Sequence, residues 1–363
     1  MALLVAAGCA GPVGEAGRGA AASLHMNDVQ VLGSHNSYKQ AIDPALYDLL
    51  LEAVGPQLAG LDYAHPSLAR QLDLGVRKLE LDVYRDPDGG RYAAPRGLAM
   101  LDSLGLPHAP WDPAPMQAAG FKVLHVQEID FRSQCPTLQA CLEDLRDWSA
   151  AHPRHLPIVV SINAKTDALA DPQAVVPLPF DAAAWAALDD EIEAVLGRGR
   201  LLRPDDVRGD RESLRDAVLD DGWPTLAAAR GRFLFVLDEP LEKLEAYAEG
   251  HPSLAGRVMF ANFPESHPAA AFLIINDPLA EQARIRAAVA AGYLVRTRAD
   301  ADTREARSGD TRRRDAAFAS GAQYVSTDYY RPDPRFGTAY EVRLPGGGVV
   351  RCNPARRPDC VLP

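Results

Sequence analysis

Short runs of apolar residues, many of them β-branched, recur along the chain and are separated by stretches with helical character. The lengths of these runs are typical of buried strands. Two of the intervening stretches, residues 278–292 and 310–321, end at a glycine just before the next run, as helices commonly do. The predicted strands cover residues 29–34, 76–84, 121–126, 156–163, 232–238, 257–262, 292–298 and 322–328.

The alternation of strand and helix predicts parallel strand pairing with right-handed crossovers. Because the strand count is that of a (βα)₈ (TIM) barrel, we predict an α/β protein with a regular or distorted barrel over residues 25–340. A ninth apolar run, residues 272–276, is assigned to a loop after the sixth strand. We expect long loops within 85–120 and 164–230, and a tail of turns over 341–363.

The length and charge of the chain narrow its range of partners. The chain has 363 residues, and loop insertions into a barrel of roughly 250 residues account for that length without a second domain. A formal net charge of −11, with no basic stripe, argues against nucleic acid binding. The same charge gives no attraction to an anionic membrane surface, so membrane contact would depend on local groups or an anchor. The sequence indicates no particular protein partner.

Four of the cysteines fall into two close pairs, Cys135 with Cys141 and Cys352 with Cys360. Neither pair has the spacing of a metal site, so we predict two disulfides. Disulfides form in oxidising compartments, which predicts a protein outside the cytoplasm. Because spacing does not prove pairing, four free buried thiols are the alternative.

The remaining cysteine, Cys9, follows a short apolar run at the start of the chain, MALLVAAGCA. This run resembles the end of a bacterial lipoprotein signal, with Cys9 lipidated and residues 1–24 forming the signal and a flexible tether. Ala6 and the lack of preceding positive charges depart from that pattern, and an ordinary or truncated cleaved signal is the alternative. Either segment predicts an exported protein, in the bacterial cell envelope or periplasm or secreted.

The predicted second strand contains two acids in an otherwise apolar run, LELDVY. Glu80 and Asp82 are two residues apart, so their side chains project from the same face of the strand. Two neighbouring carboxylates in a protein interior repel each other and need a positive partner. We therefore predict a metal ion at this position. A salt bridge from Glu80 to Arg77 or Lys78 is the alternative.

Neighbouring strands end in further polar groups at the rim where barrel enzymes build their sites. His35 and Asn36 follow the first strand, His125 ends the third, and Asn163 and Lys165 share a face at the end of the fourth. Carboxylate and amide oxygens suit a hard cation, and this mixture favours Ca²⁺ over Mg²⁺. The two histidines remain available to take and give a proton near neutral pH.

Together these segments resemble the catalytic-barrel motifs of the calcium-dependent phosphoinositide-specific phospholipases C, a family of the PLC-like phosphodiesterase superfamily. The motifs are Gly-Ser-His-Asn-Ser-Tyr (33–38), Glu-Leu-Asp-Val-Tyr (80–84), His125 and Ser-Ile-Asn (161–163). A weaker similarity extends to Val-Ser-Thr-Asp-Tyr-Tyr (325–330). The resemblance is concentrated over about residues 28–165 and implies the barrel fold of that superfamily.

The resemblance also implies roles for individual residues. His35 and His125 match the two catalytic histidines, and Lys165 matches a lysine that meets the substrate phosphate. The family usually has a glutamate where this chain has Asn163, so we expect weaker calcium binding because one ligand charge is missing. The residues that match or stand in for ligands of one Ca²⁺ ion are Asn36, Glu80, Asp82 and Asn163.

The reaction implied is cleavage of phosphatidylinositol or a related inositol phospholipid by attack of the inositol 2-hydroxyl. The products would be diacylglycerol and a cyclic inositol phosphate. We expect Arg296 or Arg298 on the seventh strand to reach phosphate. Tyr329 and Tyr330 at the end of the eighth strand are expected to stack on a sugar ring, with packing as the alternative. The alternatives are a glycerophosphodiester phosphodiesterase of the same superfamily and a non-catalytic envelope lipoprotein that binds lipid or glycan.

Overall fold

The computed structural model describes residues 24–220 and 222–362. Its sheet has eight parallel strands in the order β6-β5-β4-β2-β1-β9-β8-β7, with β3 and β10 added at its sides. The end strands β6 and β7 contact each other, so the sheet is a nearly closed barrel. The strands are β1 (Val29–Ser34), β2 (Lys78–Asp86), β3 (Gly120–Val123), β4 (Ile158–Ala164), β5 (Phe233–Leu237), β6 (Phe260–Ala261), β7 (Phe272–Ile274), β8 (Leu294–Arg298), β9 (Tyr324–Thr327) and β10 (Val350–Cys352).

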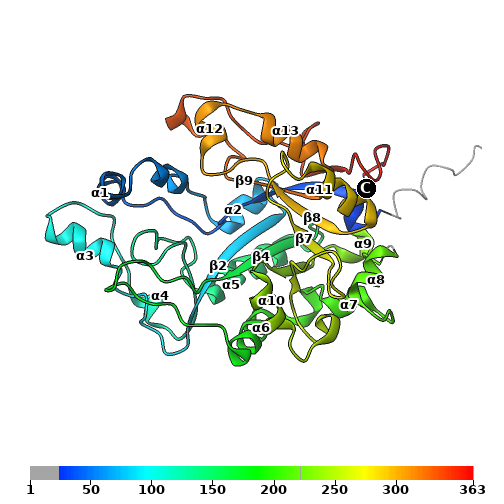
Figure 1. The fold of residues 1–363 in the computed structure, drawn as a ribbon, viewed down its shortest axis with the longest axis horizontal. Helices are drawn as coiled ribbons and strands as arrows, with labels where there is room; N and C mark the ends of the chain where they lie inside the picture. The colour runs from blue at the N-terminus through cyan, green and yellow to red at the C-terminus, as the bar shows by residue number, and fades with distance from the viewer. Residues whose placement is uncertain (1–23, 221, 363) are drawn as a thin grey trace, which may run out of the picture.

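Helices surround the sheet, and α1, α3 and α4 project together to one side of the molecule (Figure 1). The α-helices are α1 (Pro44–Val54), α2 (Leu68–Asp73), α3 (Arg96–Ser103), α4 (Ala114–Gln117), α5 (Leu138–Ala151), α6 (Ala182–Leu196), α7 (Pro204–Arg208), α8 (Leu214–Leu219), α9 (Leu226–Ala229), α10 (Leu241–Ala248), α11 (Gln282–Ala291), α12 (Arg304–Ser308) and α13 (Arg312–Ala319). Short 3₁₀ turns are Met26–Asp28, Pro56–Leu61, Arg198–Arg200, Pro252–Leu254 and Pro334–Phe336.

The structure confirms the TIM barrel but corrects one predicted strand and one predicted loop. The run at 121–126 is not the third barrel strand, because β3 pairs antiparallel with β2, Val83 facing Val123. The run at 272–276 is not a loop, because β7 pairs parallel with β8 and is the sixth barrel strand along the chain. Apolar periodicity reports that a segment is a buried strand, but it does not report which neighbour the strand pairs with or in which direction.

The two faces of β2 follow from its alternating sequence. Leu79, Leu81 and Val83 are fully buried in the main apolar core, which α5, α6 and α10 share with the strands. Glu80 and Asp82 therefore point to the opposite face, into the barrel. Several helices begin where a polar side chain accepts a backbone N–H, as Thr137 does at the start of α5.

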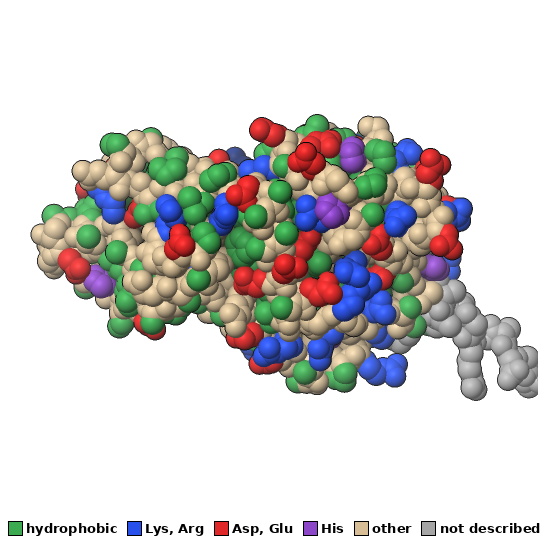
Figure 2. Space-filling model, turned by 90° about the horizontal axis from the view of Figure 1, so that it is seen from below, with side chains coloured by type: hydrophobic (Ala, Val, Ile, Leu, Met, Phe, Trp, Pro, Cys, Tyr) green, Lys and Arg blue, Asp and Glu red, His purple; other side chains and the backbone are tan. Residues whose placement is uncertain are grey.

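Both predicted disulfides, Cys135–Cys141 and Cys352–Cys360, are present. The tail is more than turns, because β10 pairs antiparallel with the start of β1. Cys9 lies outside the described residues. Within residues 24–220 and 222–362, no helix is long and apolar enough to cross a bilayer. Acidic and basic side chains lie next to one another across the face shown in Figure 2, with apolar side chains scattered between them.

A glycine in β1 permits the close approach of two neighbouring strands. A Cβ atom on Gly33 would lie 2.9 Å from Lys78 Cβ and 2.9 Å from Ser326 Oγ. We expect Gly33→Ala to lower the free energy of unfolding by about 1–3 kcal/mol, measured by urea denaturation. The control is Gly199→Ala, whose new Cβ would meet nothing within 4 Å. Equal stability of the two variants would show that β1 adjusts without cost.

Candidate active site

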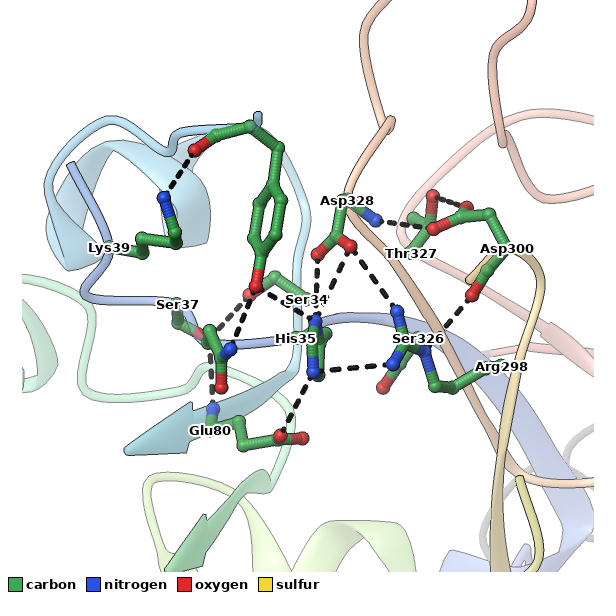
Figure 3. Close-up of polar contacts among 12 residues, drawn as sticks. Ser34, His35, Ser37, Lys39, Glu80, Arg298, Asp300, Ser326, Thr327 and Asp328 are labelled. Carbon is green, nitrogen blue, oxygen red and sulfur yellow. Dashed lines mark hydrogen bonds and ion pairs between the residues drawn. The ribbon is translucent and has the colours of Figure 1, made fainter. Parts of the chain in front are cut away.

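The imidazole of His35 lies at the centre of a polar cluster at the carboxyl ends of β1, β8 and β9, beside Glu80 near the start of β2 (Figure 3). Its Nδ1 is 3.3 Å from both carboxylate oxygens of Asp328. Its Nε2 is 3.3 Å from Nη1 of Arg298 and 3.7 Å from Oε1 of Glu80. Because arginine only donates, these contacts favour the tautomer with the proton on Nδ1 and the lone pair on Nε2.

The surroundings of His35 favour its neutral form. Burial lowers the pKa of His35 and Arg298 lowers it further, against the opposing effects of Asp328 and Glu80. Burial alone would raise the pKa of Asp328, but its contacts with His35, His65 and Arg298 outweigh burial and hold that pKa below the usual range. The arrangement is a neutral imidazole oriented by an ionised carboxylate, which is the arrangement of a general base.

Asp328 was not among the residues predicted for the site. It is held on several sides: His65 Nε2 lies 3.4 Å from Oδ1, Arg298 Nη2 lies 3.3 Å from Oδ2, and its backbone N–H donates to Asp300 Oδ1 at 3.0 Å. The sequence carried a signal for it, because Asp328 is the last residue of the eighth predicted strand and lies within the segment at 325–330. Its partner was not evident, because His35 is 293 positions away.

The second predicted catalytic histidine, His125, also has a carboxylate partner. Its Nδ1 lies 2.7 Å from Oδ2 of Asp130, which is fully buried. Because β3 runs antiparallel to β2, the chain after Val123 returns along β2 toward the acids in the barrel. Tyr84 of β2 fixes this segment by donating its hydroxyl proton to the carbonyl of His125 at 3.0 Å. Asp130 was not among the residues predicted from the sequence.

Protein cations balance the charge of Glu80. Its Oε2 accepts from Lys78 Nζ at 2.6 Å and Arg296 Nη2 at 2.8 Å, and Ser161 Oγ lies 3.4 Å away. Burial opposes ionisation of Glu80, but Lys78, Arg296 and His35 outweigh it and keep the pKa of this carboxyl low. Burial and Arg296 lower the pKa of Lys78 to about 8. The buried acids therefore do not by themselves require a metal ion, and the predicted alternative of a Lys78 salt bridge is present.

Asp82 and Asn163 face each other on adjacent strands, in register between β2 and β4. Lys165 Nζ lies 3.3 Å from Oδ2 of Asp82. Asn163 donates its Nδ2 proton to the carbonyl of Asp238 at 2.7 Å. Its Oδ1 is buried with no hydrogen-bond partner within the part of the chain that the structure describes. A buried acceptor without a donor beside a carboxylate suits a cation that binds oxygen.

Asn36 is anchored next to Glu80. The backbone of Asn36 is left-handed, with φ of 45°, and its Nδ2 donates to the hydroxyl of Tyr63 at 2.7 Å. The next residue, Ser37, exchanges hydrogen bonds with the backbone of Glu80 in both directions, at 2.9 and 2.8 Å. Among the described residues, no group of three or more His, Cys, Asp or Glu could hold a metal ion. A cation here would therefore depend on amide oxygens in addition to the two acids.

Two of the residues expected to bind substrate have buried positions. Arg296 is almost fully buried, ion-paired with Glu80, and donates from Nε to Ser326 Oγ at 3.0 Å. Tyr329 is also buried, and its ring packs against Phe336 and Tyr340. A pocket of about 390 Å³ opens beside Asp328, lined by residues 63–64 and 328–334.

A family model described as phosphoinositide phospholipase C, Ca²⁺-dependent, matches residues 24–354. This chain belongs to that family. It is an enzyme, a phosphodiesterase of the phospholipase C type, and calcium is the metal on which its family depends. Two histidine–carboxylate pairs beside an oxygen-rich rim agree with this assignment.

Solved structures show the same fold. A calcium-dependent phosphoinositol-specific phospholipase C from Pseudomonas sp. is similar with a TM-score of 0.55 and 17% identity, over 92% of this chain and 97% of that one. Its myoinositol complex has a TM-score of 0.55 and 18% identity, over 92% of this chain and 96% of that one. A Ca²⁺-dependent phosphatidylinositol-specific phospholipase C from Streptomyces antibioticus has a TM-score of 0.53 and 19% identity, over 87% of this chain and 97% of that one. No curated protein matches the sequence.

The ion pair between Arg296 and Glu80 can be tested by removing the cation. We expect Arg296→Met to lower the free energy of unfolding by about 3–5 kcal/mol, because it removes a buried partner of Glu80. Denaturant unfolding measures the loss. Arg304→Met is the control, because the ion pair of Arg304 with Asp302 is exposed and contributes no more than about 1 kcal/mol. Unchanged stability in Arg296→Met, with weaker substrate binding, would instead support a substrate-binding role.

Proposed function

We propose that this enzyme cleaves phosphatidylinositol, or a related inositol phospholipid, by attack of the inositol 2-hydroxyl on the adjacent phosphorus. One observation carries the proposal: two histidines at one rim each bond through Nδ1 to a buried carboxylate, leaving Nε2 for proton transfer. One histidine then removes a proton while the other supplies one. The products are diacylglycerol and a cyclic inositol phosphate.

In this reaction His35 is the general base. Its Nε2 takes the proton of the 2-hydroxyl as the oxygen forms a bond to phosphorus. The bond from phosphorus to the glycerol oxygen breaks, and His125 gives the proton on its Nε2 to that leaving oxygen. Because the nucleophile belongs to the substrate, proximity is provided without a covalent enzyme intermediate. The guanidinium of Arg298 lies beside His35 Nε2, where negative charge of the phosphoryl group would develop.

The residues proposed to hold one Ca²⁺ ion are Asn36, Glu80, Asp82 and Asn163. When bound, the ion supplies a lower pKa for the 2-hydroxyl and compensates negative charge on the phosphoryl oxygens. Lys165 is proposed to contact the substrate phosphate, which requires it to leave Asp82 at least in part. Arg296 and Tyr329 are proposed to support the site without contacting the substrate. Arg296 orients Glu80 through their ion pair, and Tyr329 supports the wall of the pocket beside Asp328.

The proposed setting is a membrane surface outside the cytoplasm. The two disulfides support export, because they persist in oxidising compartments. We propose contact with phospholipid either transiently or through a lipid on Cys9, in the bacterial cell envelope or after secretion. The net charge of −11 makes either local contacts or that anchor necessary.

The proposed function predicts a specific product profile. The wild type should release cyclic inositol phosphate from phosphatidylinositol vesicles, and a calcium chelator should abolish the release. His35→Ala should lower kcat by at least about 10²-fold, because the base is lost. Product separation by ³¹P NMR measures both effects.

The matched control is His251→Ala. His251 lies between α10 and the following 3₁₀ turn, in a connection that leads from a helix into a strand and not at the carboxyl ends of the strands. This variant should retain wild-type activity. Cleavage of glycerophosphodiesters in preference to phosphatidylinositol would replace the proposed substrate. Full activity with chelator present would reject the metal, and full activity of His35→Ala would reject the proton transfer.

The amide at position 163 predicts a change in calcium affinity. Asn163→Glu adds a third carboxylate to the proposed ligand set, and we expect Ca²⁺ to bind about tenfold more tightly, a gain of about 1.4 kcal/mol. Titration calorimetry with CaCl₂ measures this without substrate. Gln173→Glu adds the same charge on an exposed loop and should leave the affinity unchanged. An Asn163→Glu affinity equal to that of wild type would exclude position 163 from the cation site.

A further inference from the structure

A fully buried lysine, Lys39, stands directly after the segment that carries His35 and Asn36. Its Nζ lies 3.2 Å from Oδ1 of Asp130 and donates to the carbonyls of Tyr63 at 2.9 Å and Gln40 at 3.2 Å. Figure 3 shows the Lys39 side chain turned away from His35. Lys39 therefore does not contact His35, and its charged amine faces Asp130.

Asp130 is shared between this lysine and the second catalytic histidine. Oδ1 faces Lys39 Nζ, whereas Oδ2 lies 2.7 Å from His125 Nδ1. Its backbone closes a tight turn, because the N–H groups of His125 and Val126 both donate to the Asp130 carbonyl, at 3.2 and 3.1 Å. The carboxylate is fully buried, so each of its oxygens depends on the partner that it has.

The main chain of Lys39 also joins the two parts of the site. Its N–H donates to the carbonyl of Asn36 at 2.9 Å, and residues Lys39 and Ser133 form an antiparallel bridge. The segment with the first histidine and the turn with the second are thus connected by one residue. A displacement of the Lys39 side chain would leave Asp130 with His125 as its remaining charged partner.

We propose that Lys39 is a positioning residue for the general acid: through Asp130, it holds the His125 imidazole with Nε2 toward the leaving glycerol oxygen. This inference rests on the proposed function. The lysine neutralises Asp130, so the carboxylate orients the ring without carrying an unbalanced negative charge that would retain the ring proton. Removing the cation should therefore impair protonation of the leaving group more than any other part of the reaction.

The dependence on the leaving group distinguishes this role from a merely structural one. Phosphatidylinositol has an alkoxide leaving group that needs a proton, whereas the 4-nitrophenyl ester of inositol phosphate has one that departs without it. For Lys39→Met we expect kcat to fall about 10²-fold on phosphatidylinositol but less than tenfold on the aryl ester, with KM little changed on both. The control is Lys122→Met, which removes a buried lysine paired with Asp86 outside the site and should affect both substrates by one factor.

Asp130→Asn tests the same link without removing the lysine. It should show the same preference for the aryl ester, and the double variant should be no slower than the slower single one, because both act through His125. Equal losses on the two substrates, or multiplying losses in the double variant, would overturn the inference.

A measurement on the protein without substrate tests the inference even if the proposed substrate is wrong. It also tests the inference if a variant loses activity because it folds poorly. In the wild type, ¹⁵N NMR of the His125 ring should show Nδ1 protonated and hydrogen-bonded to Asp130, and Lys39→Met should shift the Nδ1 signal or broaden it. An unchanged His125 signal would overturn the inference. Failure of the wild type to cleave phosphatidylinositol would reject the proposed function and would leave this spectroscopic test valid.

Discussion

The balance of charge around Glu80 is the constraint on which the rest of the site depends. The acid lies inside the barrel, and its Oε2 is bound by Lys78 from its own strand and by Arg296 from β8, on the other side of β1 and β9. An ionised carboxylate at this depth is tolerated only because both cations are in contact with it. The ion pair with Arg296 therefore ties β2 to β8 across the barrel and leaves Oε1 directed at His35.

Around this point, the parallel strands deliver their carboxyl ends to one rim. His35 directly follows β1 and Asp328 directly follows β9. His125 instead lies in the segment after β3, which is antiparallel to β2. The two histidine–carboxylate pairs thus have separate supports. Asp328 is held by His65 and Arg298, and Asp130 is held by Lys39, so each ring is oriented through its own network.

Family membership and geometry agree on a phosphodiesterase, and the proposed metal site is where we expect this chain to depart from the usual pattern. Asn163 stands where the resemblance implies a glutamate, yet its Oδ1 is buried without a hydrogen-bond partner among the described residues and it stands in register with Asp82. An oxygen in that position is suited to a cation, although the protein already neutralises Glu80 with its own side chains. We therefore expect calcium to bind for catalysis more than to stabilise the fold.

The sequence by itself determined the features that depend on local residue patterns, namely the faces of the strands and the class of fold. The alternation in β2 placed Glu80 and Asp82 on one face, and the strand–helix alternation predicted the barrel. The tertiary structure decided which partners meet: β3 pairs against β2, residues 272–274 complete the barrel, and Asp328, Asp130 and Lys39 join the histidines. It also decided that Arg296 contacts the carboxylate of Glu80, across 216 positions of sequence. The physical reason is that periodicity reports the face on which a side chain lies, whereas the neutralisation of a buried charge depends on groups that only the closed barrel brings into contact.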